Sequence, residues 1–425
     1  MAAAAAFGDG HATLGVAPVR LANQRVVLAA LLRRRPYVRA APVDAHEDAD
    51  RAVKAGAWNV LLTDEPTLDV GYGPEPLFQL LAERPAGSAG AFAAPAQLLN
   101  HLPNVGALSS RIGLIRALHR RYSARGAGAP HVFDSVPVTF AIPAGSRAEA
   151  ASPTLAQCLR AVHACSHGAT DGLRMPAKHC ASNLWVVKPA VPGRGRDVLV
   201  VAGAGALRTA VEARPGEDLV VQKLVERPLT VGGGRKATLR LWVAVADTGD
   251  VYVHRHGYLM CAPGAYSAAP ALALPHATHG VMARTHIASH TTLGGGGGGG
   301  VDGGGVMSLD ELAAALVASG VAGGGGAGAR FPADVLQSIV LPACKRMVVD
   351  AVAGAWGASQ PPLAAFAAAG GGGGASSGSG SAHPRVGHRN RRSFELLGAD
   401  FQLDEDLRPW LLSFSENPAL GALER

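Results

Sequence analysis

The sequence predicts an α+β protein in which antiparallel sheets are flanked by helices, with disordered glycine-rich inserts between the elements. Residues 183–262 contain short segments rich in β-branched residues that are separated by glycine and proline turns, which is typical of an antiparallel sheet. Residues 394–420 form two apolar runs around the acidic turn Asp404-Glu405-Asp406, which predicts a hairpin. Residues 332–356 repeat apolar side chains at helical spacing.

The first part of the chain is weakly patterned. Residues 1–55 are rich in Ala and Arg and predict a weakly ordered extension with one short helix from Val26 to Arg33. Residues 56–145 predict an N-terminal α/β domain, because strand patterns at 58–62 and 136–143 enclose an amphipathic helix within residues 97–121. That helix places Leu114, Ile115 and Leu118 on one side and Arg116, Arg120 and Arg121 on another.

The rest of the chain predicts a central domain over residues 146–262 and a C-terminal domain over residues 263–425. A helix is expected from Ser152 to Ser166. The expected strands of the central domain are Leu184–Lys188, Val198–Val201, Leu219–Leu224, Thr238–Ala246 and Val251–Leu259.

Glycine-rich inserts interrupt the C-terminal domain at about residues 291–306, 320–329 and 368–384. Polyglycine has great backbone freedom and no side chain to bury, so these inserts are expected to be disordered. Between them, Ser308 and Glu311 predict a capping box at the start of a small helix. The helix expected from Pro332 to Trp356 has an apolar face made of Val335, Leu336, Ile339, Val340, Met347 and Val348.

The formal net charge of +7 favours an acidic partner through electrostatic steering, although a basic surface can equally serve solubility alone. No Lys/Arg block is dense enough to predict nucleic-acid binding, and no apolar segment approaches the length of a membrane span. The N-terminus has neither a basic flank nor a long apolar run, so no secretory signal is expected. We therefore expect a monomer that binds neither nucleic acid nor membrane.

The chain has five cysteines and no CxxC pair, which argues against a disulfide framework or zinc ribbon and favours a reducing compartment. Cys165 lies close in sequence to His163, His167 and His179, but the spacing matches no common set of metal ligands. A cytoplasmic location is expected.

A phosphate-binding pattern follows the first expected strand of the central domain. Lys188 ends that strand, and a loop with Arg194 and Gly195 follows it. A lysine provides a point charge, and glycines let backbone N–H groups approach an anion. The alternative is a lysine that ends a strand for solubility.

Two further strands carry polar residues that suit a nucleotide. The strand at 219–224 turns polar at Gln222 and Lys223, where backbone groups can meet an adenine edge. In the next strand, Lys236, Thr238 and Arg240 alternate onto one face, and two cations there suit a polyphosphate. A solvated strand face is the alternative interpretation.

Taken in order, these segments resemble the tubulin tyrosine ligase-like family, whose members are ATP-grasp ligases that join amino acids to tubulin. The segments that carry the resemblance are VVKP, GRGR, VVQKLVERPL, GGRKATLRLWV, FELLGADFQLDEDLRPWLL and NPAL. Weaker similarities lie at residues 58–64, 97–104 and 136–140, and the ending Asn417-Pro418-Ala419-Leu420 resembles the polyglycylase-like branch. The resemblance covers roughly residues 58–425 apart from the inserts and implies an ATP-grasp fold.

The resemblance implies a set of site residues for ATP and magnesium. It makes Lys188 the phosphate-binding lysine, Gln222 and Lys223 the adenine hinge, and Lys236 and Arg240 a basic pair that contacts nucleotide or acceptor. Arg111 stands where an ATP-binding lysine is usual, which keeps the charge but loses the point-charge geometry. Asp400 matches the first magnesium-binding carboxylate.

Several positions depart from the family pattern. Thr238 replaces an Asp, Met260 an Arg, His279 an Asn, and Asp197 the second glycine of the phosphate loop. Ser413 and Ser415 replace a Glu and an Asn that complete the magnesium site in the family. Because Mg²⁺ prefers carboxylate oxygens, its affinity should fall here unless a β-bulge after Phe414 turns Glu416 toward Asp400.

Two functional hypotheses follow from the resemblance. The first is an ATP-dependent ligase that adds glycine or glutamate to glutamate side chains of tubulin or another acidic protein tail, with the free amino acid as co-substrate and a microtubule- or cilium-associated location. The second is a pseudoenzyme that keeps the fold and binds tubulin or nucleotide without turnover. A third hypothesis is a mis-assembled gene sequence, in which the glycine-rich inserts replace genuine segments; a transcript spanning residues 255–310 tests it.

Overall fold

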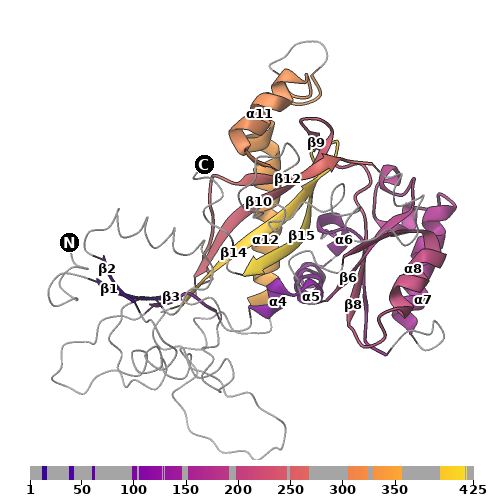
Figure 1. Ribbon diagram of the computed structural model, residues 1–425, viewed down its shortest axis with the longest axis horizontal. Coiled ribbons are helices and arrows are strands. Elements are labelled where there is room, and N and C mark those ends of the chain that lie inside the picture. The colour runs from indigo at the N-terminus through magenta and orange to yellow at the C-terminus, as the bar shows by residue number, and fades with distance from the viewer. Residues whose placement is uncertain are drawn as a thin grey trace, which may run out of the picture.

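The computed structural model describes residues 12–16, 38–42, 60–62, 98–102, 105–126, 128, 130–145, 152–190, 198–246, 249–267, 305–323, 329–356, 393–416 and 418. Their strands form three sheets, which Figure 1 shows side by side along the longest axis of the molecule. The expected helix from Val26 to Arg33 and most of the glycine-rich inserts lie outside the described residues.

The N-terminal sheet is parallel and has the order β2-β1-β3-β4. Its strands are β1 (Ala12–Val16), β2 (Val38–Pro42), β3 (Val60–Leu62) and β4 (Leu98–Leu99). The strand expected near residue 60 is present as β3. Residues 1–55, which predicted only a weakly ordered extension, contribute β1 and β2 to this same sheet.

The middle sheet is antiparallel and has the order β5-β8-β6-β7. Helices α7 (Pro153–Ser166) and α8 (Gly203–Glu212) pack on one of its faces, as Figure 1 shows. The predicted start of α7 is confirmed, because the Ser152 hydroxyl accepts a hydrogen bond from the Leu155 amide, 3.2 Å away. The strands are β5 (Thr139–Ile142), β6 (Leu184–Pro189), β7 (Leu199–Ala202) and β8 (Leu219–Lys223).

The third sheet is also antiparallel, with the order β13-β12-β10-β14-β15 and with β9 and β11 paired to β10. Its long central strand is β10 (Arg235–Ala246), which pairs with β14 along nine residues from Thr238 to Ala246. The others are β9 (Thr230–Val231), β11 (Val251–Val253), β12 (Tyr258–Ala265), β13 (Val306–Ser308), β14 (Phe394–Leu403) and β15 (Pro409–Glu416).

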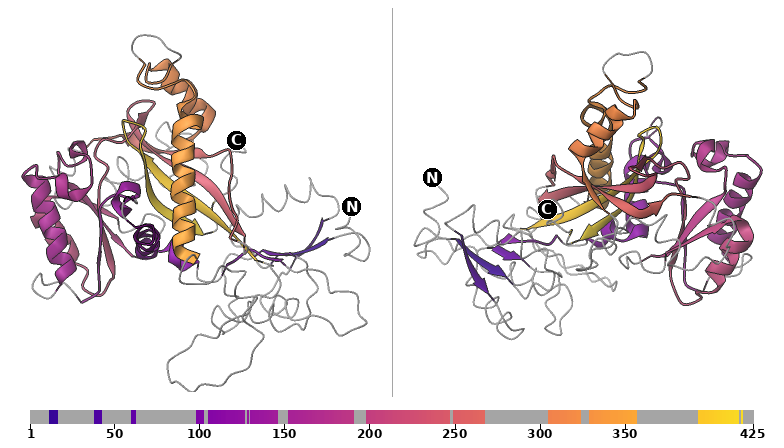
Figure 2. Two further views of the ribbon diagram at one scale, coloured as in Figure 1. Left: turned by 180° about the vertical axis from the view of Figure 1, so that it is seen from behind. Right: turned by 45° about the horizontal axis from the view of Figure 1, so that its top comes forward.

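Helices cover one face of this third sheet. Figure 2 shows α12 (Leu341–Trp356) running across it, and α5 (Arg111–Ser123) packs beside α12. The two helices approach closely at Gly354, where an added Cβ would lie 2.0 Å from the Ala117 carbonyl oxygen. The remaining helical segments are α4 (Gly106–Ser109), α6 (Val132–Ser135), η3 (Asp171–Leu173), η4 (Ala177–His179), α11 (Leu309–Ala318) and the π-helical turn η6 (Leu336–Val340).

The strands expected between residues 183 and 262 do not form one sheet, as their pattern had predicted. The expected strands between 183 and 262 belong to two sheets, which separate between Lys223 and Thr230. The strand expected over 251–259 is two strands, β11 and β12, joined by a turn. Helix α8 was not predicted, because its run of Ala and Gly resembles a loop by composition.

Two details of the C-terminal prediction need correction. Ile339 was expected on the apolar face of the long helix, but it is 48% exposed, because the π-helical turn changes the angular spacing of residues there. The ends of two predicted inserts are ordered: Val306 begins β13, and Ala322 is buried and pairs with Phe331. The capping box at Ser308 and Glu311 is confirmed.

The hairpin between β14 and β15 joins the third sheet to the middle sheet. Asp404, at its turn, accepts a hydrogen bond from the His179 ring, with Nε2 and Oδ2 3.0 Å apart, and backbone N–H bonds from Asp406 and Arg408. Burial raises the pKa of Asp404, but these bonds and the charge of Lys178 lower it to about 2. The hairpin is therefore held firmly against η4.

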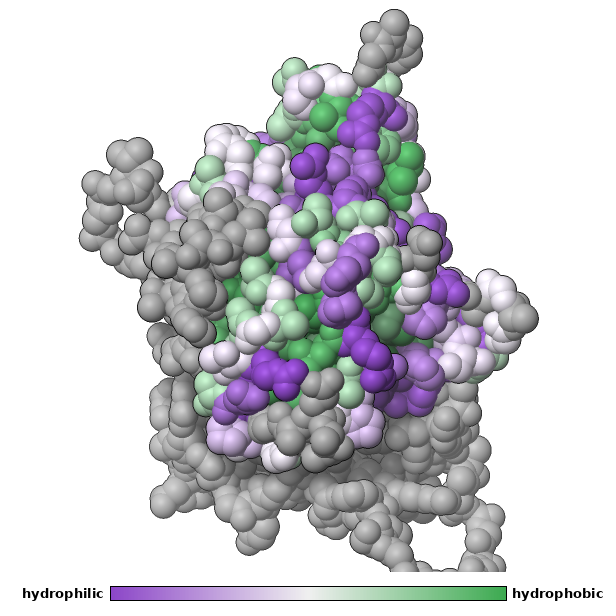
Figure 3. All heavy atoms as spheres, turned by 90° about the vertical axis from the view of Figure 1, so that its right-hand side faces the viewer, coloured by the Kyte–Doolittle hydropathy of each residue, from purple (hydrophilic) through white to green (hydrophobic). Residues whose placement is uncertain are grey.

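Polar and apolar residues are interspersed on the side of the molecule where α7 and α8 lie (Figure 3). Within the described part of the chain, no helix combines the length and the apolar character needed to span a bilayer.

Candidate functional site

Strand β10 presents a polar face opposite its apolar one. Side chains of a strand alternate between faces, so Leu239 and Leu241 enter the core below α12, whereas Lys236, Thr238 and Arg240 share the other face. All three of these polar side chains are more than nine-tenths buried. A strand face that buries two cations is unusual, because burial disfavours the charged form.

The middle sheet brings a third cation to this face. The Lys188 ammonium, near the end of β6, donates to Oε1 of Gln222 on the neighbouring strand β8 at 2.7 Å. Gln222 in turn donates through Nε2 to the Thr139 hydroxyl on β5 at 2.9 Å. This row of bonds across the sheet fixes the direction of Lys188 and places it beside Gln222.

Arg111 adds a fourth basic group from the start of α5. The Ser110 hydroxyl accepts a hydrogen bond from the Gly113 amide and so begins the helix. The Arg111 guanidinium then reaches the carbonyl oxygen of Pro189, the residue after Lys188. Arg111 therefore lies close to Lys188, and its role in ATP binding stays a prediction.

The charges of Arg111, Lys188 and Lys236 act on one another, and we call these residues the cation cluster. Burial, and then the nearby charges of Arg111 and Lys236, hold the pKa of Lys188 well below its usual value. Burial also lowers the pKa of Lys236 to about 8 and that of Arg111 to about 10. Within the described residues, no carboxylate pairs with Lys188 or Lys236, and the Lys236 ammonium lies 5.9 Å from the centre of the Tyr266 ring.

Lys223 does not bring its ammonium to this cluster. It follows Gln222 in β8, so its side chain lies on the opposite face, where it binds Glu226 at 2.5 Å and the Leu184 carbonyl at 2.7 Å. Glu226 also accepts from the amides of Ser182 and Leu184. The Lys223 side chain is thus part of a structural ion pair, and only its backbone remains available for a hinge role.

Arg240 and Asp400 form a second, separate group on the same face, which we call the paired site with Tyr258, Ser413 and Ser415. Arg240 lies opposite Asp400 in the register of β10 and β14 and binds it with two parallel hydrogen bonds, Nε to Oδ1 at 2.7 Å and Nη2 to Oδ2 at 2.6 Å. Burial lowers the pKa of Arg240, but the charge of Asp400 and its hydrogen bonds raise it above the ordinary value.

The two serines complete the paired site. Ser413 lies directly opposite Asp400 and donates to its Oδ2 at 3.4 Å, while the Ser415 hydroxyl accepts from Nη2 of Arg240 at 3.2 Å. The expectation that these hydroxyls share a face with Asp400 is consistent with this register.

Glu416 does not join them. The β-bulge in this hairpin lies between Ser413 and Leu411, before Phe414 rather than after it, and the pairing is regular from Ser413 to Glu416. Glu416 therefore pairs with Leu397 on the opposite face, and its charge contributes to raising the pKa of Glu395 there, after the larger effect of burial. The rescue of the metal site by a bulge, considered from the sequence, is contradicted.

These donors do not fit a magnesium ion. Asp400 is the single carboxylate among the site residues of this face, and both of its oxygens already accept hydrogen bonds from Arg240. Neutral hydroxyls from Ser413 and Ser415 cannot supply the missing charge. In the described ranges of the chain, no group of three or more His, Cys, Asp or Glu residues is placed to hold a metal, including the cluster considered around Cys165.

Several predicted positions lie outside the described residues: Arg194, Gly195, Asp197 and His279. Two departures from the family pattern are visible. Thr238 pairs with Gln402 across the strands, and Met260 is buried on β12 opposite Thr238. Among the described buried side chains, Oε1 of Gln402 is the one atom without a hydrogen-bond partner.

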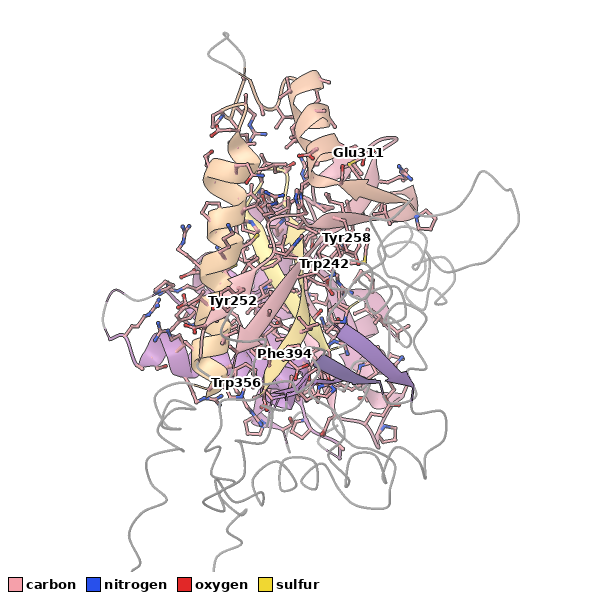
Figure 4. All side chains as sticks on the ribbon, turned by 90° about the vertical axis from the view of Figure 1, so that its left-hand side faces the viewer. Trp242, Tyr252, Tyr258, Glu311, Trp356 and Phe394 are labelled. Atoms are coloured by element: carbon pink, nitrogen blue, oxygen red, sulfur yellow. The ribbon has the colours of Figure 1, made fainter. Side chains whose placement is uncertain are left out.

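The sequence patterns did not reveal Tyr258, which belongs to the paired site, or Gly398, which lies beside it. Tyr258 on β12 hydrogen-bonds Arg240, and burial raises the pKa of Tyr258 to about 12. Figure 4 shows Tyr258 close to Trp242, with ring centres 5.2 Å apart. Gly398 provides the space for Arg240, because a Cβ there would lie 3.1 Å from its Nε. No motif marks either residue, and only the register of the sheet identifies them.

Two antiparallel sheets whose facing strands present lysines and arginines, with helices packed behind each sheet, place this protein in the ATP-grasp-like α+β class. A model of the Tubulin-tyrosine ligase family matches residues 92–279 and 375–425, which is more than half of the chain. The protein therefore belongs to the tubulin-tyrosine ligase family.

Comparison with characterised proteins finds distant relatives within that family. Tubulin monoglycylase TTLL3 of Danio rerio is 25% identical over 245 residues, which cover 56% of this chain and 26% of that protein. The Mus musculus and Homo sapiens proteins of the same name are 23% and 25% identical over 253 residues and are covered over 22% and 26% of their lengths. The chain thus spans about a quarter of the length of these relatives.

Proposed function

We propose that this protein is an ATP-dependent ligase that attaches an amino acid, glycine or glutamate, to glutamate side chains of tubulin or another acidic protein. The observation that carries the proposal is the cation cluster. Arg111, Lys188 and Lys236 come from a helix and two different sheets and lie close enough for their charges to interact. Such a group is suited to the phosphates of a nucleotide.

The electrostatics of the cluster support binding of an anion. In the unliganded protein the cluster is unfavourable, because burial, and then the charges of Arg111 and Lys236, disfavour the protonated form and lower the pKa of Lys188. A polyphosphate would replace this repulsion with charge-assisted hydrogen bonds and restore the protonated form of the lysines. Gln222 holds Lys188 in place before the ligand arrives, which reduces the entropy lost on binding.

The reaction implied by the family proceeds through an acyl phosphate. The acceptor carboxylate attacks the γ-phosphorus of ATP and releases ADP, and the amine of the incoming amino acid then displaces phosphate to form an amide. In this chain, Lys188, Lys236 and Arg111 would neutralise the charge on the phosphates and align them. Because the donors present do not fit magnesium, no step is assigned to a metal.

An acidic acceptor is compatible with the surface beside the site. Helix α5 begins at Arg111 in the cluster and carries exposed Arg116, Arg120 and His119 further along, and it contains no acidic residue. A tail rich in glutamate would be attracted to this helix before its side chain reaches the nucleotide. The proposal implies a cytoplasmic protein associated with microtubules or cilia.

The proposal is tested in two steps with the whole chain. ATP should raise the unfolding temperature, because a ligand that binds only the native state stabilises it by about 2.7 kcal/mol at a hundred times its Kd. Mass spectrometry of tubulin incubated with the protein, ATP and glycine or glutamate should then show added residues. Absence of any thermal shift at millimolar ATP contradicts the proposal.

A second candidate function is favoured by the paired site. The bidentate bond between Arg240 and Asp400 and the hydroxyls of Ser413 and Ser415 leave no free carboxylate for catalysis among the described residues of this face. These observations favour a protein that keeps the family fold and binds nucleotide and an acidic protein without catalysing a reaction. A clear thermal shift with ATP, combined with no modified tubulin and no release of ADP, would distinguish this candidate from the ligase.

A further inference from the structure

We propose that the cation cluster binds a nucleoside triphosphate without a divalent metal, because fixed side-chain charges take the place of the ion. The inference rests on the nucleotide site proposed above and adds the form of its ligand: the free triphosphate rather than its magnesium complex. It arises from the contrast between the paired site, where Arg240 meets Asp400, and the cluster, where Lys188 and Lys236 meet no carboxylate among the described residues.

The carboxylate of the paired site is already engaged by Arg240. Asp400 is buried, and its two oxygens accept bonds of 2.7 and 2.6 Å from Arg240. A cation of charge two would have to displace a guanidinium that is already held by Tyr258 and Ser415 as well. Displacing it would leave a buried arginine without its counter-ion, which is strongly unfavourable.

The space around Arg240 also suits the ion pair. Gly398 lies under the guanidinium on β14, and a side chain there would meet Nε at 3.1 Å and Cδ at 3.3 Å. The absence of a Cβ lets Arg240 lie flat against the strand beside Asp400. Ser413 and Ser415 are small enough to face the pair from β15. The surrounding residues are thus adapted to the ion pair and not to an octahedral ion.

The cation cluster supplies positive charge for a triphosphate in place of a metal ion. Magnesium normally reduces the charge of a triphosphate at such sites. Here Lys188 and Lys236 are buried without a carboxylate partner in the part of the chain that is described, and Arg111 lies beside them. Their combined charge is available to the phosphates directly.

The test measures ATP binding to the whole chain by calorimetry, once in excess EDTA and once in excess magnesium chloride. We expect the two Kd values to differ by less than about tenfold, or 1.4 kcal/mol. A Kd at least tenfold tighter with magnesium overturns the inference but leaves the nucleotide site standing. Failure to bind in both media overturns the proposed function as well, so the two failures are distinguishable.

Two arginine variants test whether ATP binds at the cation cluster. Arg111→Met should weaken ATP binding in EDTA at least about tenfold, whereas Arg160→Met, at an exposed position on helix α7, should not. Equal effects of the two changes would overturn the placement of the ligand at the cluster.

A second pair of variants tests the missing carboxylate. The double variant Arg240→Met with Ser413→Glu frees Asp400 and places a second acid opposite it, and it should make ATP bind at least about tenfold more tightly with magnesium than with EDTA. The double variant Arg240→Met with Ser413→Gln has the same size without the added charge and should stay independent of metal. An unchanged ratio in the Glu variant would show that the missing carboxylate is not the cause of metal independence, which overturns the inference.

Discussion

Two groups of charges lie on one face of strand β10, and they differ in what completes them. Arg240 meets Asp400 across the strands with two short hydrogen bonds, so its charge is satisfied within the protein. Lys236, four residues earlier on the same face, meets no carboxylate within the described residues and shares its surroundings with Lys188 and Arg111.

This difference indicates which of the two groups can bind an anionic ligand. In a buried ion pair each charge is neutralised by the other, and a ligand that breaks the pair must offset the cost of leaving a buried charge unpaired. Buried cations without a counter-ion are unfavourable in the free protein, and a bound anion removes that cost. The cluster is therefore expected to control ligand binding, and the paired site to control stability. The following variants test this division.

The largest effect is expected from Asp400→Ala. The change leaves Arg240 buried without its counter-ion, which should lower the free energy of unfolding by about 3–5 kcal/mol. Urea denaturation measures it. The double variant Arg240→Met with Asp400→Leu serves as a control and should be much closer to the parent protein. A loss below about 1 kcal/mol in Asp400→Ala would contradict the structural role of the pair.

Lys223→Met should lower the free energy of unfolding by about 3 kcal/mol and should leave the affinity for ATP almost unchanged. Its ammonium binds buried Glu226 on the face of β8 that points away from the cluster, so the variant leaves Glu226 without its cation. Calorimetry should find an ATP affinity within about twofold of the parent protein. A strong loss of affinity in the folded variant would show that Lys223 belongs to the site.

Lys188→Met should show the opposite pattern. It removes a charge-assisted hydrogen bond to the ligand, worth about 1.5–3 kcal/mol, so the Kd for ATP should rise about 10- to 100-fold. The free protein should lose little stability, because removing a buried charge that is repelled by Arg111 and Lys236 offsets the lost hydrogen bond to Gln222. A destabilised variant with normal affinity would reverse the assignment.

The pH dependence of binding and of stability should have opposite signs. Since the pKa of Lys236 is about 8 in the free protein, ATP affinity should fall about tenfold between pH 7 and pH 9 as the ammonium loses its proton. Over the range from about 8 to the ordinary lysine pKa, the unfolded chain binds more protons, so the contribution of Lys236 to stability rises with pH. Calorimetry in buffers of different ionisation enthalpy should detect proton uptake on binding above pH 8.

Ser413→Ala should have the smallest effect. The hydroxyl donates to Asp400 over 3.4 Å, a long hydrogen bond, so its loss should cost less than about 0.5–1 kcal/mol of stability. Thermal unfolding measures the change, and ATP affinity should remain the same. A larger loss would mean that the hydroxyl supports Asp400 more strongly than its geometry indicates.

Most of the local structure could be predicted because it depends on neighbouring residues. The cap at Ser152, the capping box at Ser308 and the hairpin around residues 404–406 each follow from side chains within a few positions of one another. Helix α8 and the π-helical turn at Leu336–Val340 could not be predicted, because packing against the rest of the protein stabilises them and composition does not reveal it.

The sequence by itself determined the alternation along each strand: Lys236 and Arg240 share a face, Gln222 and Lys223 take opposite faces, and Ser413 and Ser415 point the same way. Only the tertiary structure decided which face meets which neighbour. The register of β10, β14 and β15 joined Arg240 to Asp400 and turned Glu416 away, and the approach of the middle sheet placed Lys188 beside Lys236. Alternation is a property of the backbone of one strand, whereas the pairing of charges depends on contacts between segments far apart in the chain.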